Sequence, residues 1–415
     1  MHFLRRPFAF PAELDRALQR HFFGGAEPSP AALKPLARSL EQLWPQLARE
    51  RGQRASKHYS GARPSAEAYA AYYLPANAMK LPLVLEEARV FGLSIGAPAG
   101  TRTRWLDVGS GPGTAYWGLA WWARCRGFDV ELSGLEQSPE FVALAGALAR
   151  ALTAELAAGQ PAPRWDVFRH GGGKGASLVD RIAASKPHVV SMMNSIGEMA
   201  PDGAERGAWI GEVAGALAAA ARSDGAPRWL VVVEPGSKAA TRELLELRES
   251  LRSREDARIW LPCLSARRCG ALERPDDWCH EESAVEFPKW MDGLGAAAGL
   301  RKEAVLFSYL VCSFGVHPAE PAGWPGTGAR VVSQRMKEKG LTQCFLCTTD
   351  GKRKARVLDS RRTAANEAFV ESARGQVFAD VQLDAKGDVQ SFTDCGAAGE
   401  ADVTVFPRPG PGRRS

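Results

Sequence analysis

The chain has 415 residues, of which 45% are apolar, 24% charged and 8% aromatic. This is the composition of a globular protein, and it excludes a collagen, an extended disordered chain and a coiled-coil rod. At about 150 residues per domain, the length predicts two or three domains. The formal net charge is mildly basic at +6. No run approaches the ~18 uninterrupted apolar residues of a membrane-spanning helix.

The N-terminus lacks the pattern of an export signal. Arg5 and Arg6 are followed by Pro7 and then by Glu13 and Asp15, which interrupt any long apolar run. We therefore expect a cytoplasmic protein without a transmembrane segment. A mitochondrial presequence stays open, although the early acidic residues argue against one.

Residues 1–100 have the pattern of a helical region. Leucines recur at steps of three and four residues along Ala31–Glu50, which is the stripe of an amphipathic helix. Pro45 should kink that helix or end it early. A second helical stretch, Ala66–Val90, follows. The simplest interpretation is that both helices pack as a cap on the next domain.

Residues 101–315 alternate between short β-rich runs and Ala-rich helical segments such as Phe141–Ala157 and Ala204–Ala221. Such alternation predicts βαβ units and a parallel sheet. Residues 255–290 carry three Cys together with Trp, Pro and many charges, so we interpret them as an insertion between the fifth and sixth strands. The six predicted strands are Arg104–Val108, Val130–Leu135, Trp165–Phe168, His188–Met193, Trp229–Val233 and Ala304–Ser313.

Residues 316–400 begin with a Pro/Gly-rich linker and continue as a small β-rich extension. Two strands, Cys344–Thr348 and Ala355–Asp359, are separated by Asp350-Gly351, a hairpin turn signal, and a further strand pair surrounds Lys386-Gly387. Residues 330–362 hold 10 Lys and Arg against 3 Asp and Glu, a net charge of +7. A tail over residues 401–415 is expected to be disordered.

The most informative single motif joins a predicted strand to a predicted helix. Its glycines allow a sharp turn and a close approach of the backbone to a ligand. Glu136 ends the next strand, 27 residues after Gly109, and is placed to accept the hydroxyl protons of a ribose. The motif is Leu106-Asp107-Val108-Gly109-Ser110-Gly111-Pro112-Gly113-Thr114.

Two cofactors compete for such a loop. Nicotinamide dinucleotides prefer G-x-G-x-x-G, whereas this chain has G-x-G-P-G with Asp107 two residues earlier. That pattern resembles the S-adenosylmethionine loop of class I methyltransferases, whose cationic methionine portion favours a nearby acid. We therefore predict an α/β fold with a Rossmann-like methyltransferase sheet, and an S-adenosylmethionine site. An ordinary strand-to-helix turn is the alternative.

Catalytic residues are not identified. Amino-group methyltransferases resemble one another in an Asn/Asp-Pro-Pro-aromatic motif after the fourth strand, but here that position reads Met192–Met199 without the Pro-Pro-aromatic part. Asn194 and Glu198 are candidates to face the cofactor, or equally to cap the next helix. Cys125 and Cys312 lie in a predicted helix and a buried strand, so neither is a convincing nucleophile.

Three of the eight cysteines fall within 17 residues of the insertion, as Cys263, Cys269 and Cys279, and a Cys344-x-x-Cys347 pair lies on the basic hairpin. A charged, Pro-rich loop is unlike the apolar surroundings of structural thiols. Thiolates prefer soft metals. The wide spacing favours a [4Fe–4S] cluster over zinc, whose structural sites have close Cys pairs. A site without metal is the third alternative.

With these residues identified, the chain resembles the methyltransferase-like assembly factors of the small ribosomal subunit, which occur in mitochondria and have bacterial relatives. The Trp-Cys-His element and the late Cys-x-x-Cys-x-x-Asp-Gly are the most specific features. The stretches that carry the resemblance are Leu106–Thr114, Val233-Glu234-Pro235-Gly236-Ser237, Pro262–Cys269, Asp277-Trp278-Cys279-His280 and Cys344–Gly351.

This resemblance implies a Rossmann-like domain, a four-cysteine iron–sulfur cluster and binding to small-subunit rRNA during assembly. The family's cluster ligands fall on Cys263, Cys269, Cys279 and Cys347, with Cys344 as a neighbour. The chain departs from the family in having Leu264-Ser265 where Pro-His is usual, and in lacking the Trp-Gly-Asp expected near residues 375–378.

Two functional hypotheses follow. In the first, the protein binds S-adenosylmethionine, a [4Fe–4S] cluster and small-subunit rRNA, and assists subunit assembly or translation. In the second, it is an active methyltransferase on RNA or a small molecule, with a structural zinc ion or no metal. A radical enzyme is disfavoured because its C-x3-C-x2-C loop is absent. No sequence feature predicts oligomers, so we favour a monomer.

Overall fold

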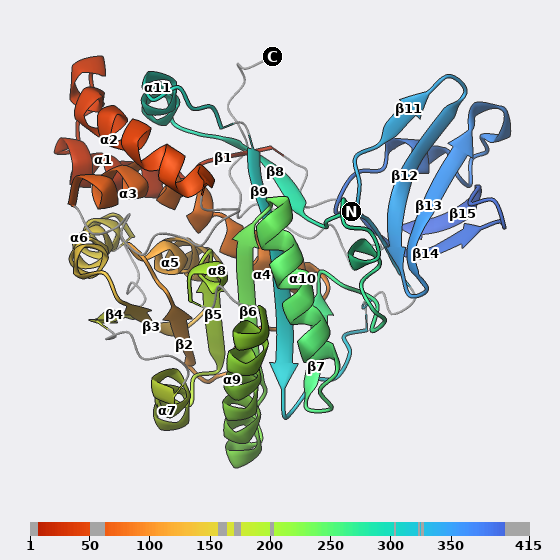
Figure 1. Ribbon diagram of the computed structural model, residues 1–415, viewed down its shortest axis with the longest axis horizontal. Coiled ribbons are helices and arrows are strands. Elements are labelled where there is room, and N and C mark those ends of the chain that lie inside the picture. The colour runs from red at the N-terminus through yellow and green to blue at the C-terminus, as the bar shows by residue number, and fades with distance from the viewer. Residues whose placement is uncertain are drawn as a thin grey trace.

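The computed structural model describes residues 7–49, 63–156, 164–169, 176–199, 203–302, 304–322, 324 and 328–394. Over these residues the chain forms a nine-stranded mixed sheet with helices on both faces and a separate six-stranded antiparallel sheet. The second sheet lies to one side of the first (Figure 1). None of the helices in these ranges is long and apolar enough to cross a membrane. The tail predicted at 401–415 lies outside the described residues.

Helices precede the sheet, as expected. The helix predicted at Ala31–Glu50 continues past Pro45 to Arg49, so the proline does not end it early. The stretch Ala66–Val90 forms two helices that meet at Met79. The elements of this cap are β1 (Phe8–Ala9), α1 (Ala12–Phe23), α2 (Pro30–Arg49), α3 (Arg63–Ala78) and α4 (Lys80–Val90).

Five parallel strands form the centre of the main sheet, in the spatial order β4-β3-β2-β5-β6. The order reverses between β2 and β5, and ligands of such sheets bind beyond the carboxyl ends of the strands at this switch point. All five predicted strands are confirmed. They are β2 (Thr103–Val108), β3 (Val130–Glu136), β4 (Arg164–Arg169), β5 (Val189–Met193) and β6 (Arg228–Pro235).

The sixth predicted strand, β9 (Ala304–Phe314), runs antiparallel to β6. Both β7 (Ala257–Leu261) and β8 (Glu281–Glu286) pair with β9. The expected insertion at 255–290 therefore includes two strands of the main sheet. Its three cysteines lie in the connection between them, residues 262–280, which contains one 3-10 turn, η2 (Gly270–Leu272).

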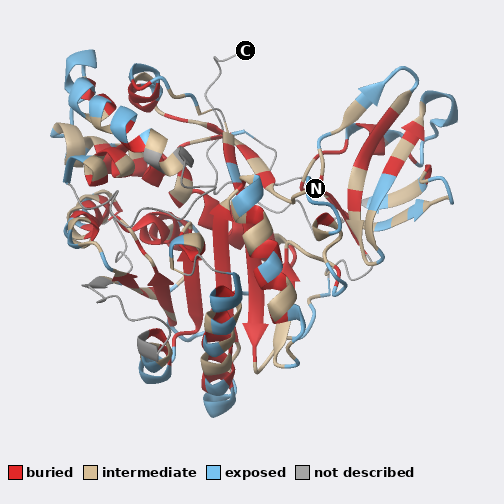
Figure 2. Cartoon of the chain, viewed as in Figure 1, coloured by how far each residue is buried: buried red, intermediate tan, exposed pale blue. Residues whose placement is uncertain are grey.

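The helices cover the sheet in two layers. The cap, α5, α6 and α11 pack on one face, and α7, α8, α9 and α10 on the other. Alternate residues of β6 enter the two cores: Val231 and Val233 join the first, Leu230 and Val232 the second. Such strands are buried on both faces and therefore read as continuous apolar runs (Figure 2). The helices are α5 (Thr114–Arg126), α6 (Pro139–Leu156), α7 (Ala176–Ser185), α8 (Ile196–Met199), α9 (Gly203–Asp224), α10 (Lys238–Arg252) and α11 (Lys289–Ala297).

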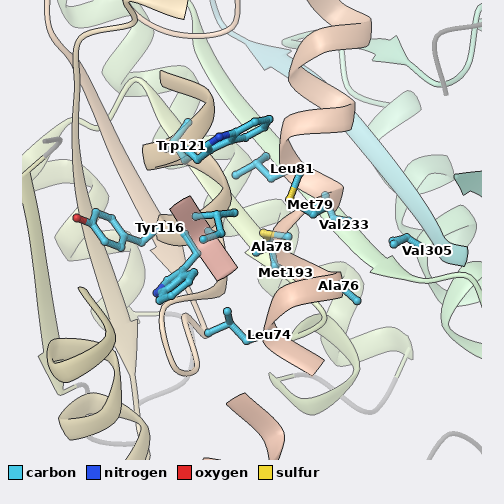
Figure 3. Packing of buried hydrophobic residues seen from close by; sticks show 14 of the residues in the cluster. Leu74, Ala76, Ala78, Met79, Leu81, Tyr116, Trp121, Met193, Val233 and Val305 are labelled. Atoms are coloured by element: carbon cyan, nitrogen blue, oxygen red, sulfur yellow. The ribbon is translucent and has the colours of Figure 1, made fainter. Parts of the chain in front are cut away.

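The cap is part of the core rather than a loosely attached lid. Ala78, Met79 and Leu81, at the α3–α4 junction, pack beside Trp121 of α5 and Val233 of β6 (Figure 3). The two helix backbones approach so closely that a Cβ atom on Gly118 would lie 2.0 Å from the Ala78 carbonyl oxygen. Only glycine fits this position of α5.

The second sheet has its own apolar core. Its hairpin differs from expectation by one residue: Thr348 pairs with Gly351, so Thr349-Asp350 form the turn and Gly351 opens the next strand with a positive φ of 108°. Glycine tolerates that conformation. The strands are β10 (Ala329–Val331), β11 (Met336–Glu338), β12 (Leu341–Thr348), β13 (Gly351–Leu358), β14 (Val377–Leu383) and β15 (Val389–Asp394), with 3-10 turns at Asp359–Arg361 and Glu367–Glu371.

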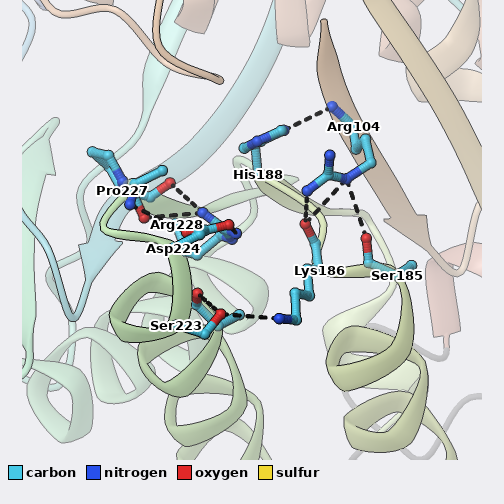
Figure 4. Close-up of polar contacts among 10 residues, drawn as sticks. Arg104, Ser185, Lys186, His188, Ser223, Asp224, Pro227 and Arg228 are labelled. Atoms are coloured by element: carbon cyan, nitrogen blue, oxygen red, sulfur yellow. Dashed lines mark hydrogen bonds and ion pairs between the residues drawn. The ribbon is translucent and has the colours of Figure 1, made fainter. Parts of the chain in front are cut away.

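The amino ends of the central strands carry polar groups that bond to one another (Figure 4). The backbone N–H of Arg104 donates to Nδ1 of His188 at 3.0 Å, and the Arg104 guanidinium donates to the Lys186 carbonyl at 2.8 Å. Arg228 pairs with Asp224. We interpret this edge as structural because most of these groups bond to one another, although Nε of Arg228 is buried without a hydrogen-bond partner among the described residues.

Candidate cofactor edge and four-cysteine site

The glycine loop follows β2 at the carboxyl edge, as its sequence predicts. Gly109, Gly111 and Gly113 have φ values of 70°, 54° and 90°, which side-chain-bearing residues rarely adopt. Gly113 is the residue before the first turn of α5. A Cβ atom on Gly109 would lie 2.6 Å from Cβ of Ser195. Both backbone conformation and space therefore require glycine here.

Asp107 ends in a buried position beneath this loop. One carboxylate oxygen accepts a hydrogen bond from the Ser191 hydroxyl at 2.6 Å. Burial raises the pKa of Asp107 to about 7, although the Ser191 bond opposes the shift. Among the residues that the structure describes, the other Asp107 oxygen and the Ser110 hydroxyl are buried without a hydrogen-bond partner. Two buried polar atoms without partners at the switch point fit a site in which a bound polar ligand supplies the missing hydrogen bonds.

Glu136 lies against the loop at the end of β3. Its carboxylate accepts the backbone N–H groups of Gly111 at 2.7 Å and of Gln137 and Ser138 at 2.8 Å. A carboxylate offers about four acceptor positions, so about one remains. Burial raises the pKa of Glu136, and these backbone bonds lower it. Binding both hydroxyls of a ribose would require Gly111 to release its bond.

Asn194 ends β5 in the left-handed conformation, with φ of 55°. Its side-chain oxygen accepts a hydrogen bond from Lys80 at 3.0 Å, so the cap reaches the cofactor edge. Glu234, at the end of β6, accepts the N–H groups of Ser195 and Ile196 at 3.1 and 3.0 Å. The other candidate of this segment, Glu198, is exposed on α8.

The pKa of Glu234 is raised to about 7 by burial, while the Ser195 and Ile196 backbone bonds and the Lys80 ammonium oppose the shift. Sequence reasoning did not select Lys80 or Glu234 as site residues. The available signal was a lone lysine within the apolar stretch of α4, and an acid placed directly after a fully apolar strand.

The three insertion cysteines and one cysteine of the basic hairpin influence one another electrostatically. Burial raises the pKa of Cys347 to about 12, and the neighbouring thiols of Cys263 and Cys269 raise it further. Burial also raises the pKa of Cys279, with contributions from the other three thiols. Four sulfur atoms from two distant segments are therefore within electrostatic reach of one another.

Cys344 lies apart from this group. It belongs to the apolar core of the second sheet, together with Leu346, because successive residues of β12 face opposite sides. Burial raises its pKa to about 12, the neighbouring Ser372 side chain opposes the shift, and no thiol contributes. Cys125 is exposed on α5 and Cys312 is buried in β9. Cys395 lies outside the described residues.

No site for a single metal ion occurs in the described ranges, where no group of three or more His, Cys, Asp or Glu side chains is arranged to hold one. The indole N–H of Trp278 and Nδ1 of His280, on either side of Cys279, are also buried without a partner within the described residues.

Two buried arginines flank the thiols. Arg248 of α10 donates from Nε to the Cys263 sulfur at 3.2 Å and from Nη2 to the Ser265 carbonyl at 2.6 Å. Its neighbour Glu249 accepts the backbone N–H of Cys269 at 3.0 Å. The signal in the sequence was an arginine on the apolar stripe of a helix, four residues after Leu244 and three before Leu251.

Arg330 of β10 joins the second sheet to the rest of the molecule. It donates to the Pro262 carbonyl at 2.9 Å and pairs with Glu87 of α4 and Glu281 of β8. Its register partner on β12 is Cys347. One buried side chain thus connects the cap, the main sheet and both cysteine-bearing segments. From the sequence, Arg330 was identified only as one of the basic residues of the segment 330–362.

Further contacts fasten the hairpin to the cysteine-bearing loop. Lys352 of β13 forms an ion pair with Asp277, and the Ser265 hydroxyl donates to the Thr349 carbonyl at 3.2 Å. A Cβ atom on Gly270 would lie 2.8 Å from the Lys352 side chain. The two segments therefore pack against each other without any bound group.

The basic hairpin presents one face that is both cationic and aromatic. Lys354 of β13 lies opposite Phe345 of β12, and Lys352 lies opposite Cys347, so these four side chains share a face of the sheet. The Lys352 ammonium lies 5.0 Å from the centre of the Phe345 ring. The thiol site and this basic–aromatic face, defined by Phe345, Lys352 and Lys354, are thus adjacent.

The exposed charge of the hairpin is smaller than the sequence count of +7 implies. Arg330 is buried between two acids, and Arg356 and Arg361 both pair with Asp388, which lies outside residues 330–362. Within the part of the chain that the structure describes, the exposed lysines of this segment without an ion-pair contact are Lys337, Lys339 and Lys354.

Comparison with known proteins identifies a family. A family model described as mitochondrial small ribosomal subunit Rsm22 matches residues 63–389, most of the chain. No curated protein matches. The matched solved structures include a putative class I S-adenosylmethionine-dependent methyltransferase from Listeria monocytogenes, at 11% identity and a TM-score of 0.33, covering 74% of this chain and 89% of that one.

A second is an S-adenosylmethionine-dependent methyltransferase from Geobacter sulfurreducens in complex with S-adenosylhomocysteine, at 18% identity and a TM-score of 0.27, covering 57% of this chain and 90% of that one. A third is the precorrin-6y C5,15-methyltransferase from Geobacter metallireducens, at 10% identity and a TM-score of 0.30, covering 57% of this chain and 87% of that one. The strand order of the main sheet, five parallel strands with an order reversal between β2 and β5 and the antiparallel β9 beside β6, is itself the Rossmann-like α/β arrangement that the sequence predicts, with an additional antiparallel sheet.

Proposed function

This chain belongs to the Rsm22 family of mitochondrial small ribosomal subunit proteins, and we propose that it binds S-adenosylmethionine, a [4Fe–4S] cluster and small-subunit rRNA, and assists assembly or translation of the small subunit. Family membership and the methyltransferase-like fold are the starting point. The family description names mitochondria, and cell fractionation would show whether this chain is found there.

The observation that carries the proposal is the direct packing of the β7–β8 connection against the second sheet, through the Ser265–Thr349, Lys352–Asp277 and Arg330–Pro262 contacts. The electrostatic influence of the four thiols on one another supports it. Cys263, Cys269, Cys279 and Cys347 are the donor set that iron–sulfur clusters use, and each thiolate of a cubane binds a different iron. Ligands of a cubane are therefore more widely separated than those of one zinc ion. Unpartnered N–H and ring nitrogen atoms beside Cys279 are further groups that such a centre would satisfy.

The carboxyl edge supports the cofactor half of the proposal. S-adenosylmethionine supplies a methyl group on a sulfonium ion when it is bound. Asp107 and Ser110 offer the polar atoms that lack partners, and an ionised Asp107 attracts the cationic methionine portion. Glu136 and Asn194 would contact the ribose and the methionine end, respectively. The glycine backbone leaves room for the ligand at the switch point.

The basic–aromatic face supports the RNA half. Lys354 on this face, and Lys337 and Lys339 elsewhere on the second sheet, are exposed cations that would contact phosphates without regard to sequence. Phe345 is half-buried between basic side chains and presents a ring on which an unpaired base can stack. A cluster bound by Cys347 would stiffen the strand that carries Phe345.

The proposal is tested by anaerobic purification with iron, sulfide and zinc analysis. We expect about four irons per chain and broad absorbance near ~400 nm. Cys263→Ser should lose the iron and weaken rRNA binding at matched salt. Cys344→Ser, on the same strand as Cys347 but in the apolar core, is the control and should keep its iron. One zinc per chain, or rRNA binding that is unchanged in Cys263→Ser, contradicts the proposal.

A second candidate function is methyl transfer to RNA or a small molecule. The observation in its favour is the left-handed backbone of Asn194 at the end of β5, because non-glycine residues in this conformation cluster at active sites. Transfer of labelled methyl from S-adenosylmethionine to rRNA or extract fractions, and its loss in Asp107→Ala, would support it. An absence of labelled product from every fraction would argue against it.

A further inference from the structure

Arg248 is the most deeply buried cation in direct contact with a proposed cluster ligand. Its side chain is 2% exposed, and its Nε–H points at the Cys263 sulfur from 3.2 Å. The helix that carries it is α10, which packs on the opposite face of the sheet from the cap. Neither the glycine loop nor the basic–aromatic face accounts for a buried arginine at this position.

The charge balance around Arg248 is incomplete without a bound anion. Glu249 is its acidic partner, but the same carboxylate also pairs with Arg252 and accepts the Cys269 N–H. Two guanidinium groups thus share one carboxylate. Burying a cation is unfavourable unless it is paired. A thiolate at Cys263 would turn a weak N–H to thiol contact into a charge-assisted bond.

Arg248 and Glu249 also hold two different ligands from adjacent positions of one helix. Arg248 contacts the Cys263 sulfur and the Ser265 carbonyl, whereas Glu249 fixes the backbone of Cys269. Hydrogen-bonding groups around a metal centre orient its ligands and adjust its electronic properties. Hydrogen bonds to cluster sulfurs are one of the factors that set the reduction potential.

We propose that Arg248, together with Glu249, is a positioning pair for the iron–sulfur centre: it holds Cys263 and Cys269 at the spacing the cluster needs and stabilises the reduced, more negative form. This inference rests on the proposed function, since it requires the cluster. Four thiolates outweigh the positive charge of the iron–sulfide core, so the bound centre is an anion beside a fixed cation. Arg248 touches no part of the cofactor edge and is not a catalytic residue.

The test compares Arg248→Lys with the wild type after anaerobic reconstitution. Lysine keeps the charge but loses the planar guanidinium that reaches both Cys263 and the Ser265 carbonyl. We expect iron release to a chelator to accelerate about tenfold. The reduction potential is measured by a dye-mediated titration with dithionite, which donates one electron to the cluster. We expect Arg248→Gln to have a lower potential, by about 59 mV for each tenfold decrease in the equilibrium constant for reduction of the cluster.

Arg252→Gln is the matched control, because Arg252 pairs with the same Glu249 carboxylate but is 36% exposed and contacts no cysteine. The Arg252→Gln variant should retain the iron-release rate and the reduction potential of the wild type. Glu249→Gln provides a second variant if the Arg248 variants do not fold, and it should also release iron faster. Wild-type release rates and potentials in the Arg248 and Glu249 variants would overturn the inference. A wild-type protein without iron would instead defeat the proposed function.

Discussion

At the carboxyl edge of the sheet, two acids are buried in positions where water would normally solvate them. Asp107 lies beneath the glycine loop and Glu234 beneath the turn that follows β5, and burial raises the pKa of each to about 7. Each accepts hydrogen bonds, but from groups that only partly replace water. The folded protein therefore holds protons that the unfolded chain releases.

These raised pKa values predict how stability depends on pH. Between pH ~4 and ~7 the unfolded chain binds fewer protons than the fold, so the free energy of unfolding falls as pH rises. Each unit of pKa difference corresponds to about 1.4 kcal/mol. Asp107→Asn should remove part of this slope, so the variant gains stability over the wild type at pH 8 and little at pH 4. Urea unfolding of both proteins at several pH values between ~4 and ~8 measures this difference in the free energy of unfolding.

Asp129→Asn is the control for this measurement, because the Asp129 side chain is 61% exposed and pairs only with Arg102 at the surface. Its unfolding free energy should run parallel to that of the wild type. Parallel curves for Asp107→Asn as well would show that the Asp107 carboxyl is already ionised in the fold, contrary to the prediction.

Among the elements, α5 approaches the α3–α4 junction so closely that only a glycine fits at the contact. Gly118 allows it, because the position that a Cβ atom would take is 2.0 Å from the Ala78 carbonyl and 2.9 Å from Pro82. Trp121 on the same helix lies beside Leu81, whereas Tyr116 points away from the cap, toward Trp165 and Thr153 (Figure 3). The cap, which also brings Lys80 to the cofactor edge, depends on this approach.

Gly118→Ala should therefore destabilise the protein by about 3 kcal/mol or more, because α5 and the cap must separate to accept the methyl group. The matched control is Gly146→Ala on α6, where the nearest atom to the new Cβ is the end of the flexible Arg150 side chain at 3.6 Å. That change should be neutral or stabilise by up to about 1 kcal/mol, through helix propensity alone. Chemical denaturation of both variants checks the difference.

For the molecule as a whole, a buried ion network joins the three parts of the chain. Arg330 of the second sheet lies between Glu87 of the cap and Glu281 of the main sheet, and Tyr309 donates its hydroxyl proton to Glu87. Removing one member of a buried ion pair leaves the others uncompensated. The second sheet is therefore fixed to the main sheet at the point where both cysteine-bearing segments meet.

Arg330→Met should cost about 3–5 kcal/mol in stability, because Glu87 and Glu281 then lose the buried cation that pairs with both of them. We also expect the second sheet to become susceptible to limited proteolysis near residues 316–328 and the iron content to fall. Arg335→Met is the control, since Arg335 pairs with the exposed Glu371 at the surface. Equal protease resistance of the two variants would contradict this account of the junction.

Local patterns were sufficient for much of the fold. Apolar runs such as Trp229–Val233 predict the five parallel strands because those strands are buried on both faces. The segment 255–290 was harder, because β8 alternates buried and half-buried residues in a charged stretch, and only pairing with β9 makes it a strand of the main sheet. The hairpin turn was displaced by one residue, since Gly351 supplies its positive φ from the first strand position rather than within the turn.

Some residues of the candidate site could also be predicted from the sequence, and others could not. The glycine loop and Glu136 were recognisable because a strand, a turn and a helix of fixed spacing carry them along the chain. Distinguishing Cys347 from Cys344 also needed only the alternation of β12, once its register was known. Lys80, Arg248 and Arg330 could not be selected, because each acts on residues more than ten positions away in sequence.

By itself, the amino-acid sequence determined the order of helices and strands, the conformation of the glycine loop and the family to which the chain belongs, because these depend on periodicity, backbone preference and short motifs. The tertiary structure alone decided which charges are exposed, which acids are buried and which side chains surround the four thiols. The physical reason is that desolvation and ion pairing depend on neighbours in space, and the chain brings those neighbours together only when both sheets and the cap are packed.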